Sequence, residues 1–302
     1  MEENIKMLNH ISDYDEMVGA ETLHPLVNVV DFSKLPPLRN ISVRRMFGYY
    51  AVYLKGPKSS ELYYGRSKYS YEEGTLVFFA PGQVVGTDDD GQYHQMKTRV
   101  LMFHPDLLKG CPLAGLMNTY TYFSYTTNES LFLTPKEKGF VLDCFSRVEE
   151  ELRHFDACSL SVVTDYIKLL LDCCVRFYNR QFAACRVQNR DILARLETLI
   201  DDYFVSDAPH REGVPTVAGC AERLHLSANY LNDLVRQSTG LSALKLLHRK
   251  MLNIAKARLS DSSRRVNEVA EDMGFRQPQN FSNWFKKMEG CTPLQYRTAI
   301  QR

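Results

Sequence analysis

The spacing of hydrophobic positions changes once along the chain, from a period of two residues to periods of three and four. Between about Ile41 and Phe103, aromatic and β-branched residues alternate with polar ones, and Gly or Pro interrupts them every several residues. This alternation is typical of half-buried strands, and the Gly and Pro residues are typical of turns. The pattern predicts a small antiparallel sandwich or barrel that follows a polar lead-in.

From Pro135 onward the pattern is helical. One apolar stripe runs from Phe140 to Leu152 and a second lies within Leu160–Phe182, as expected for two helices with one buried face each. Thr134 supplies an N-cap, and the proline after it suits a first helical position. These helices suit packing on the sheet or against a second copy of the chain, and the sequence favours neither. The stretch 206–215 contains two prolines and a glycine and predicts an irregular loop.

The last part of the chain contains a diverged internal duplication. Positions 231–242 align with positions 281–292 at an offset of 50, and Ala221 aligns with Ala270 at an offset of 49. Each copy consists of a short helical pattern, a turn and a longer helical pattern. This is the arrangement of a helix-turn-helix unit, so the sequence predicts two such units.

Between the copies, one apolar stripe predicts a helix from about Ser242 to Leu259. At 1.5 Å per residue, this helix is roughly 27 Å long. Two longer helices held by such a strut could enter successive major grooves, which lie about 34 Å apart on B-DNA. In the second copy, Gly274 is expected to adopt the positive φ that ends the short helix, and Pro278 is expected to begin the longer one.

The charge distribution separates the two ends of the chain. The 302-residue sequence has a formal net charge of +1. From Arg211 to Arg302, however, there are 15 Lys and Arg against 8 Asp and Glu, a balance of +7, whereas the remainder has 22 against 28, a balance of −6. This asymmetry indicates a nucleic-acid-binding C-terminal domain attached to a part that does not bind nucleic acid.

The longer helix of each copy carries amide and cationic side chains outside its apolar stripe. Asn and Gln can form two hydrogen bonds with adenine, while Lys and Arg bind guanine or phosphate. A solvated polar face would explain either helix alone, but two such helices in the basic part of the chain favour DNA. The candidate DNA-binding residues are Asn229, Asn232, Asp233 and Arg236 in the first copy, and Arg276, Gln279, Asn280, Asn283, Lys286 and Lys287 in the second.

The segment from about Val217 to Arg297 resembles the AraC/XylS family of bacterial transcriptional regulators. The resemblance rests on the stretches LSANYLNDLVRQSTGLS (226–242), RKMLNIAKARL (249–259) and VNEVAEDMGFRQPQNFSNWFKKMEGCTPLQYR (266–297). It implies that the base-facing positions are Asn229, Asn232 and Asp233 in the first copy, and Gln279, Asn280 and Asn283 in the second.

Two of these positions depart from the family pattern. Asp233 and Asn283 stand where similar proteins often carry Arg. The first copy is therefore expected to bind weakly or to favour cytosine N4 through the carboxylate, and the second to lose a phosphate or guanine contact. Arg236, Lys286 and Lys287 could still hold the DNA backbone.

The resemblance also implies a cupin-like β-barrel in the N-terminal half, which binds a small effector, dimerises or does both. Gly74 and the Pro-Gly pair that follows it suit a cupin-type strand and turn, but Val84 and Val85 stand where catalytic cupins carry metal-binding histidines. His94 and His104 are isolated candidates. The aromatic residues of this region could line an effector pocket or pack across strands, and both explanations stay open.

Other chemistry is not indicated by the sequence. The eight cysteines form no C-x2-C pair and the eight histidines form no paired metal motif, so we expect buried free thiols and no metal or cofactor. No apolar run reaches the roughly 18 residues that cross a bilayer, and the first residues lack the features of a secretory signal. We therefore expect a cytoplasmic protein without a membrane partner.

Together these features predict an α+β protein with two domains. The N-terminal domain is expected to be a cupin-like antiparallel β-barrel or sandwich with connector helices, and the C-terminal domain to be all-α, with seven helices and two helix-turn-helix units. The expected boundaries are a lead-in over 1–30, an effector or dimerisation barrel over 31–130, connector helices over 131–187 and an AraC-type DNA-binding domain over 188–302.

The predicted function is sequence-specific, DNA-binding regulation of transcription, without enzyme activity. The expected partners are double-stranded DNA, RNA polymerase, a small-molecule effector and a second copy of the chain, and the resemblance alone favours activation over repression. Two alternatives stay open. One is a metal-dependent cupin-type enzyme with an appended DNA-binding module, and the other is a regulator controlled by a protein partner.

Overall fold

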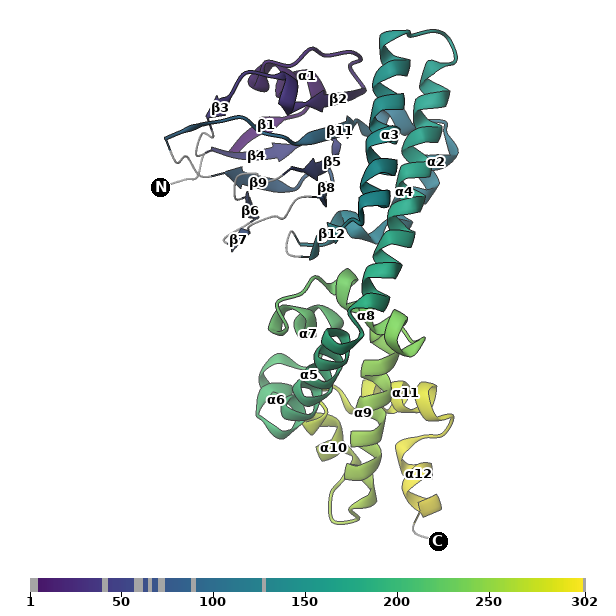
Figure 1. Cartoon of the computed structure of the whole chain (residues 1–302). Coiled ribbons are helices and arrows are strands. Elements are labelled where there is room, and N and C mark those ends of the chain that lie inside the picture. The colour runs from purple at the N-terminus through teal and green to yellow at the C-terminus, as the bar shows by residue number, and fades with distance from the viewer. Residues whose placement is uncertain are drawn as a thin grey trace. The chain divides into compact units, whose positions relative to one another are not determined.

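The computed structural model follows the change in hydrophobic period, with all strands of the described residues before residue 133 and the long helices after it (Figure 1). It describes residues 5–39, 43–56, 62–64, 67–69, 74–87, 91–126 and 129–300. The chain divides into two compact units, Met1–Gln181 and Phe182–Arg302, called here the sheet unit and the helical unit.

The strands of the sheet unit form two five-stranded sheets and one two-stranded ladder. They span Ile5–Leu8 (β1), Val27–Asp31 (β2), Leu38–Arg39 (β3), Val43–Phe47 (β4), Tyr50–Lys55 (β5), Leu62–Tyr64 (β6), Ser67–Tyr69 (β7), Thr75–Phe79 (β8), Val84–Thr87 (β9), Tyr93–His94 (β10), Arg99–Phe103 (β11) and Leu131–Phe132 (β12). One sheet has the order β1-β4-β9-β6-β7, with β1 and β4 parallel. The other has the order β12-β8-β5-β11-β2 and is antiparallel, and β10 pairs with β3.

The α+β fold class predicted from the sequence is confirmed, but within the described residues the strands stay in three separate sheets and do not close into a barrel. The two larger sheets share one core, to which Phe47 and Val85 contribute from the first sheet and Tyr53, Phe79 and Met102 from the second. Alternation along a strand gives the face that is buried, but it does not determine which remote strands pair. Of the two forms that the sequence left open, barrel and sandwich, the two packed sheets match the sandwich.

The first 30 residues, which the sequence assigns to a lead-in, contribute β1, most of β2 and the helix α1 (Ile11–Val18) to the sheet unit. Ile11, Tyr14 and Val18 are buried in the shared core. The Tyr53 hydroxyl donates a hydrogen bond to the Tyr14 hydroxyl at 2.9 Å. These contacts fix α1 against the sheets.

The second sheet is buried on both faces, because helices cover the face turned away from the shared core. On that face, Phe78 packs against Tyr122 and Tyr178, with ring centroids 4.5 and 6.2 Å apart. All of Ala51–Lys55 is buried for this reason. The covering elements are α3 (Pro135–Arg153), α4 (Ser159–Ala184), α2 (Pro112–Leu116) and the 3-10 turns η2 (Pro105–Leu108), η3 (Met117–Thr119) and η4 (Thr121–Ser124), while η1 (Phe32–Lys34) follows β2.

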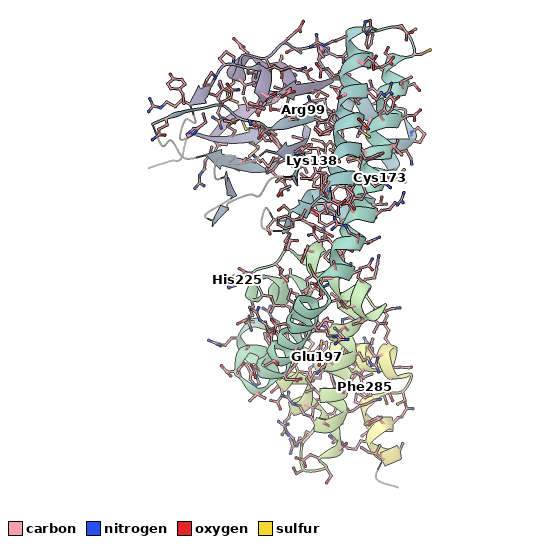
Figure 2. All side chains as sticks on the ribbon, viewed as in Figure 1. Arg99, Lys138, Cys173, Glu197, His225 and Phe285 are labelled. Atoms are coloured by element: carbon pink, nitrogen blue, oxygen red, sulfur yellow. The ribbon has the colours of Figure 1, made fainter. Side chains whose placement is uncertain are left out.

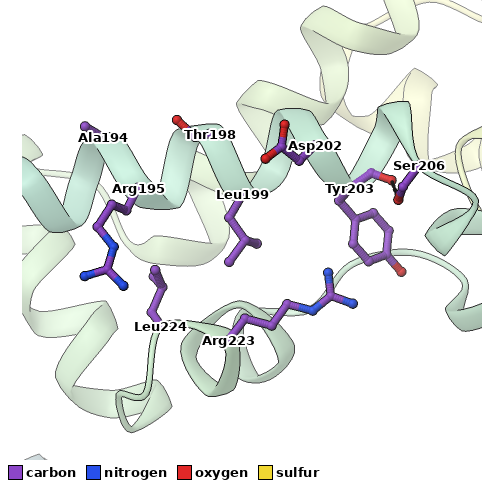
Figure 3. A pocket seen from close by; sticks show the side chains of 9 residues that line it. All are labelled: Ala194, Arg195, Thr198, Leu199, Asp202, Tyr203, Ser206, Arg223 and Leu224. Atoms are coloured by element: carbon purple, nitrogen blue, oxygen red, sulfur yellow. Dashed lines mark hydrogen bonds between the residues drawn. The ribbon is translucent and has the colours of Figure 1, made fainter.

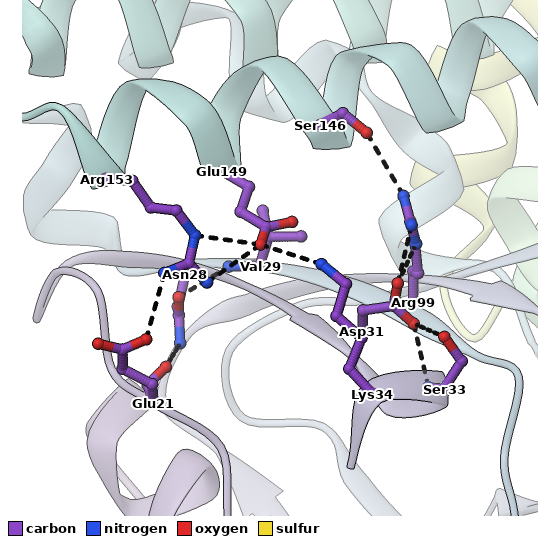
Figure 4. A network of polar contacts seen from close by, with 10 residues as sticks. All are labelled: Glu21, Asn28, Val29, Asp31, Ser33, Lys34, Arg99, Ser146, Glu149 and Arg153. Carbon is purple, nitrogen blue, oxygen red and sulfur yellow. Dashed lines mark hydrogen bonds and ion pairs between the residues drawn. The ribbon is translucent and has the colours of Figure 1, made fainter.

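A polar network joins α3 to the edge of this sheet (Figure 4). The Arg99 Nε and Nη2 atoms lie 2.8 and 2.7 Å from Asp31 Oδ2. Arg99 Nη1 also donates to Ser146 Oγ on α3 at 3.4 Å, and Lys34 Nζ lies 3.4 Å from Glu149 Oε1 of the same helix. The network orients α3 across β2 and β11.

The predicted start of α3 is confirmed. Thr134 Oγ1 accepts a hydrogen bond from Glu137 N at 3.3 Å, and the Glu137 carboxylate accepts one from Thr134 N at 2.8 Å. This reciprocal arrangement satisfies two backbone donors that the first turn would otherwise leave without a partner. The predicted stripe is also buried, through Val141, Phe145 and Leu152 among others.

The helical unit contains eight helices among its described residues, one more than predicted. They are α5 (Arg186–Val205), α6 (Ala208–Glu212), α7 (Val217–Arg223), α8 (Ala228–Thr239), α9 (Ala243–Ser260), α10 (Val266–Asp272), α11 (Pro278–Glu289) and α12 (Pro293–Ile300). The additional helix is α6, which lies in the stretch 206–215 where the sequence predicted an irregular loop. Pro209 occupies its first turn, where the missing N–H costs no hydrogen bond.

α9 is the strut between the two copies. Leu247, Met251, Ala255 and Leu259 form its buried face, as the sequence predicted. Leu244 also falls on the predicted apolar stripe, but it is 51% exposed because it stands in the first turn, beyond the packed part of the face. α9 contacts α8 of the first copy and α10 and α11 of the second.

The turns of the two copies repeat the same backbone hydrogen bond. In the first copy, Leu226 N donates to Ala221 O at 2.9 Å, and in the second, Phe275 N donates to Ala270 O at 3.0 Å. The predicted duplication is thus confirmed at the level of backbone geometry, with the offset of 49 that the sequence gives for this segment.

The residue before each of these donors adopts a positive φ. Gly274 has φ +84°, as predicted, and His225 takes the equivalent place with φ +59°. The His225 side chain is labelled in Figure 2. A Cβ atom on Gly274 would lie 2.4 Å from Gly213 O, a distance that real Cβ atoms do not show. The second turn therefore needs glycine both for its φ and for the close approach of another loop.

Candidate nucleic-acid interface

α8 and α11 begin and end at aligned positions, and each is 12 residues long. Ser227 caps α8 by accepting a hydrogen bond from Tyr230 N at 3.1 Å, while Pro278 stands in the first turn of α11. Gly240 and Gly290 end the two helices with φ +73° and +88°. Because the two helices start and end at aligned positions, aligned residues occupy equivalent places on them.

The predicted residues of α11 lie together on one exposed face. Phe281 and Phe285 are fully buried on the opposite side, and the exposed residues follow at helical spacings of three and four. In the part of the chain that the structure describes, no side-chain hydrogen bond or ion pair engages this face. Its exposed residues are Gln279, Asn280, Asn283, Lys286 and Lys287, and Arg276 is exposed just before the helix.

The predicted residues of α8 are less uniformly exposed. Asn229 and Arg236 are exposed, whereas Asn232 and Asp233 are half-buried. Asn229 and Asp233 each take part in an interaction within the chain. The structure therefore brings the four residues to one side of α8, but it does not present them as an open surface.

Asn232 has a structural role that the sequence did not predict. Its Oδ1 atom accepts a hydrogen bond from the backbone N–H of Ala243, at 3.1 Å. Ala243 is the first residue of α9, and the first N–H groups of a helix have no partner within it. The Asn232 carboxamide therefore helps to cap α9.

A second contact on α8 involves Tyr230, which is not among the candidate DNA-binding residues. Its ring centroid lies 5.1 Å from that of the buried Phe182, and Phe182 O accepts a hydrogen bond from Asn189 Nδ2 at 2.7 Å. The offset of 50 places Tyr230 opposite Asn280. An alignment of the two copies could therefore have shown that an aromatic residue replaces a base-reading amide at this position.

The electrostatic surroundings of the two faces also differ. Arg276, Lys286 and Lys287 flank the amides of α11, whereas Asp233 offsets Arg236 on α8. Lys287 acts on a neighbour on α9: burial lowers the pKa of His248, and the charge of Lys287 lowers it further. The α11 face thus combines amides and cations, which is the chemistry required by a major groove lined with phosphates.

Trp284 lies beside this face, on the side of α11 that packs inward. Its ring centroid is 5.5 Å from that of Phe275 in the turn and 6.2 Å from that of His248 on α9. Its indole Nε1 atom is buried without a hydrogen-bond partner among the described residues. Trp284 therefore joins α11 to both the turn and the strut.

The helical unit also has a groove of about 570 Å³ between α5 and the end of α7 (Figure 3). Arg223 Nη2 lies 2.7 Å from Glu212 Oε2, and its guanidinium carbon is 5.1 Å from the centre of the Tyr203 ring. The groove is lined by Ala194, Arg195, Thr198, Leu199, Asp202, Tyr203, Ser206, Arg223 and Leu224.

The isolated histidines and the cysteines form no metal site among the described residues, where no group of three His, Cys, Asp or Glu side chains could hold an ion. His104 Nδ1 instead accepts a hydrogen bond from Asp106 N at 3.1 Å and so caps η2. All eight cysteines are free thiols. Across the same described residues, no helix has the length and hydropathy needed to span a bilayer.

Comparisons with known proteins follow the boundary of the duplication. A family described as "Helix-turn-helix domain" matches residues 220–299. The HTH-type transcriptional regulator YtdP of Bacillus subtilis is 34% identical over 99 residues, which make up 32% of this chain and 13% of that protein. The raffinose operon transcriptional regulatory protein RafR of Pediococcus pentosaceus is 35% identical over 85 residues, which make up 28% of this chain and 31% of that protein.

A longer similarity extends into the sheet unit. The RCS-specific HTH-type transcriptional activator RclR of Escherichia coli is 24% identical over 249 residues, covering 79% of this chain and 83% of that protein. By contrast, the chain spans less than a third of the length of YtdP and of RafR. The two relatives with the higher identities thus match less than a third of this chain each.

Proposed function

We propose that this chain, whose residues 220–299 form a helix-turn-helix domain of the AraC/XylS type, is a sequence-specific, DNA-binding regulator of transcription. The observation that carries the proposal is the exposed face of α11, where Gln279, Asn280 and Asn283 lie between cations. Amides in this position can bond base edges, while the cations bond phosphates. α8 supplies a second polar face, and α9 holds the two helices in one unit.

The length of α9 supports binding to one side of the duplex. Its 18 residues correspond to about 27 Å along the helix axis, which is comparable to the roughly 34 Å between successive turns of a major groove. A single chain can then contact two turns of the duplex. The names of the matched relatives, all transcriptional regulators, favour this function over the metal-dependent enzyme that the sequence left open.

For the sheet unit, we propose the binding of a small effector, pairing with a second copy of the chain, or both. Support for an effector comes from the shared core, where the Tyr49 hydroxyl is buried without a hydrogen-bond partner among the described residues. Such a group is costly unless water or a ligand completes its bonding. Contact with RNA polymerase, and activation rather than repression, rest on the family resemblance alone.

The proposal is tested by selecting binding sites from a random duplex library with the full-length protein, followed by affinity measurements at several salt concentrations. We expect an enriched motif and an affinity that falls steeply with salt, because Lys and Arg contacts release counterions from the phosphates. Binding without any enriched sequence, or the absence of duplex binding, would contradict the proposal.

A further inference from the structure

The two helix-turn-helix units differ at every outward position that the duplication aligns. The offset of 50 that relates the two longer helices brings each residue of α8 opposite one residue of α11. The resulting pairs are Asn229 and Gln279, Tyr230 and Asn280, Asn232 and Ser282, Asp233 and Asn283, Arg236 and Lys286, and Gln237 and Lys287. Amides or cations fill five of the six positions on α11 and four of the six on α8, where the other two residues are Tyr230 and Asp233.

On α8, the side chains at two of these positions form contacts within the protein. The Asn232 Oδ1 atom accepts the N–H of Ala243 at 3.1 Å, so a bidentate bond from its carboxamide to adenine would compete with a helix cap. The Tyr230 ring packs on Phe182 at 5.1 Å and is half-buried. Both contacts oppose the use of these side chains for base recognition.

The charge of α8 also opposes close approach to DNA. Asp233 is half-buried in the middle of the face, and its carboxylate cancels the charge of Arg236 one turn further on. At the aligned positions, α11 has the neutral Asn283 and the cation Lys286, and Lys287 adds a second cation where α8 has Gln237. The attraction to phosphates is therefore concentrated on the second unit.

On α11, by contrast, the outward side chains are available. Gln279, Asn280 and Asn283 are exposed, and within the described residues no hydrogen bond or ion pair holds them. Bidentate recognition requires that both the oxygen and the nitrogen of an amide be available. Among the aligned positions, α11 meets that requirement three times.

We propose that α11 reads the base sequence, whereas α8 holds the protein on the duplex one turn away without selecting among bases. This inference rests on the proposed function, because it assigns different tasks to the two units of a DNA reader. It follows from the contacts of Asn232 and Tyr230, the charge of Asp233 and the open amide face of α11. The selected DNA motif then spans one block, although the protein covers two turns.

The test compares aligned substitutions in the full-length protein. Site selection and competition binding are carried out on the wild type, on Gln279→Ala and Asn283→Ala, and on the matched variants Asn229→Ala and Asp233→Ala. We expect each α11 variant to lose about 5- to 150-fold of the preference for one base pair of the motif. The two α8 variants should leave every base preference unchanged and alter the affinity for all duplexes by the same factor.

The possible outcomes test the inference that only α11 reads bases separately from the proposed function of the chain. A single-block motif that only the α11 variants relax supports the inference. A two-block motif, in which Asn229→Ala or Asp233→Ala relaxes one block, overturns it while the proposed function stands. A wild-type protein without any enriched motif overturns both. Circular dichroism melting of each variant is measured alongside, so that affinities are compared only between folded proteins.

Discussion

Position 274 requires glycine for two reasons, a positive φ and a close neighbouring backbone, whereas the aligned position 225 has only the positive φ. Both residues adopt a positive φ, but only Gly274 has a neighbouring backbone, Gly213 O, within 2.4 Å of where a Cβ atom would lie. A non-glycine residue can occupy the left-handed region at a cost of about 1–2 kcal/mol. It cannot occupy space already filled by another loop.

Gly274→Ala should therefore lower the free energy of unfolding of the helical unit by about 2 kcal/mol or more, since strain and overlap add. His225→Gly is the matched change, and it should raise that free energy by up to about 1 kcal/mol by relieving the strain. Urea denaturation followed by far-ultraviolet circular dichroism measures both. Equal and small effects at the two positions would show that the contact with Gly213 does not constrain the turn.

Lys287 is expected to act as a phosphate anchor and not as a base reader. Lys287→Ala should weaken binding to all duplexes by a similar factor and lower the slope of log affinity against log salt by about one. Lys250→Ala is the control, because Lys250 Nζ faces α5 and lies 3.5 Å from Glu197 and from Asp201. A change in base preference caused by Lys287→Ala, or the same loss of slope in the control, would rule out this assignment.

At the scale of elements, the connection between α8 and α9 depends on Asn232, a residue that the sequence predicted to contact DNA. Asn232→Ala removes the acceptor of the Ala243 N–H and should lower the free energy of unfolding by about 0.5–1.5 kcal/mol. Ser282→Ala, at the aligned position of α11, should change it by less than about 0.5 kcal/mol. Thermal and urea denaturation of the two variants make the comparison, and similar losses in both would contradict the capping role.

β5 shows how burial on both faces affects a charged residue. Lys55 is the last residue of this strand and is 5% exposed, and burial lowers the pKa of its ammonium group to about 7. The folded state thus loses a proton near pH 7, whereas the unfolded chain keeps it up to the ordinary lysine pKa of about 10.4.

Between these two pH values the unfolded state binds more protons, so stability rises with pH. The contribution of Lys55 to the free energy of unfolding should increase by about 1.4 kcal/mol per pH unit from about pH 7 to about pH 10. Lys55→Met should remove this contribution, and the difference between wild type and variant should shrink steadily as the pH rises. Urea titrations of both proteins between pH 6 and 10 test this, and a constant difference would show that Lys55 does not titrate in this range.

Across the whole molecule, local patterns predicted the elements well and long-range contacts poorly. The turn at Gly274, the cap at Thr134 and the buried stripe of α9 depend on neighbours in sequence, and all three are confirmed. The choice between a barrel and a sandwich could not be predicted, because strand pairing, such as the parallel contact of β1 with β4, joins remote segments. α6 was missed because a proline that suits a first helical turn also suits a loop.

At the candidate interface too, local patterns were predicted and long-range contacts were not. Hydrophobic periodicity correctly placed Gln279, Asn280 and Asn283 outside the apolar stripe of α11. It could not show that Asn232 bonds the next helix or that Tyr230 packs on Phe182, because both contacts join residues that no local pattern relates. The assignment of these residues to DNA contacts stays a prediction that the binding experiments address.

Because of its position, Trp284 can serve as an intrinsic fluorescence probe of the surroundings of α11. It is the single tryptophan of the chain, and its indole lies between the turn residue Phe275 and the strut residue His248. Indole emission responds to the polarity around the ring, and no other tryptophan contributes a background. A shift in emission during a titration with duplex would therefore report the surroundings of α11 alone, without any label.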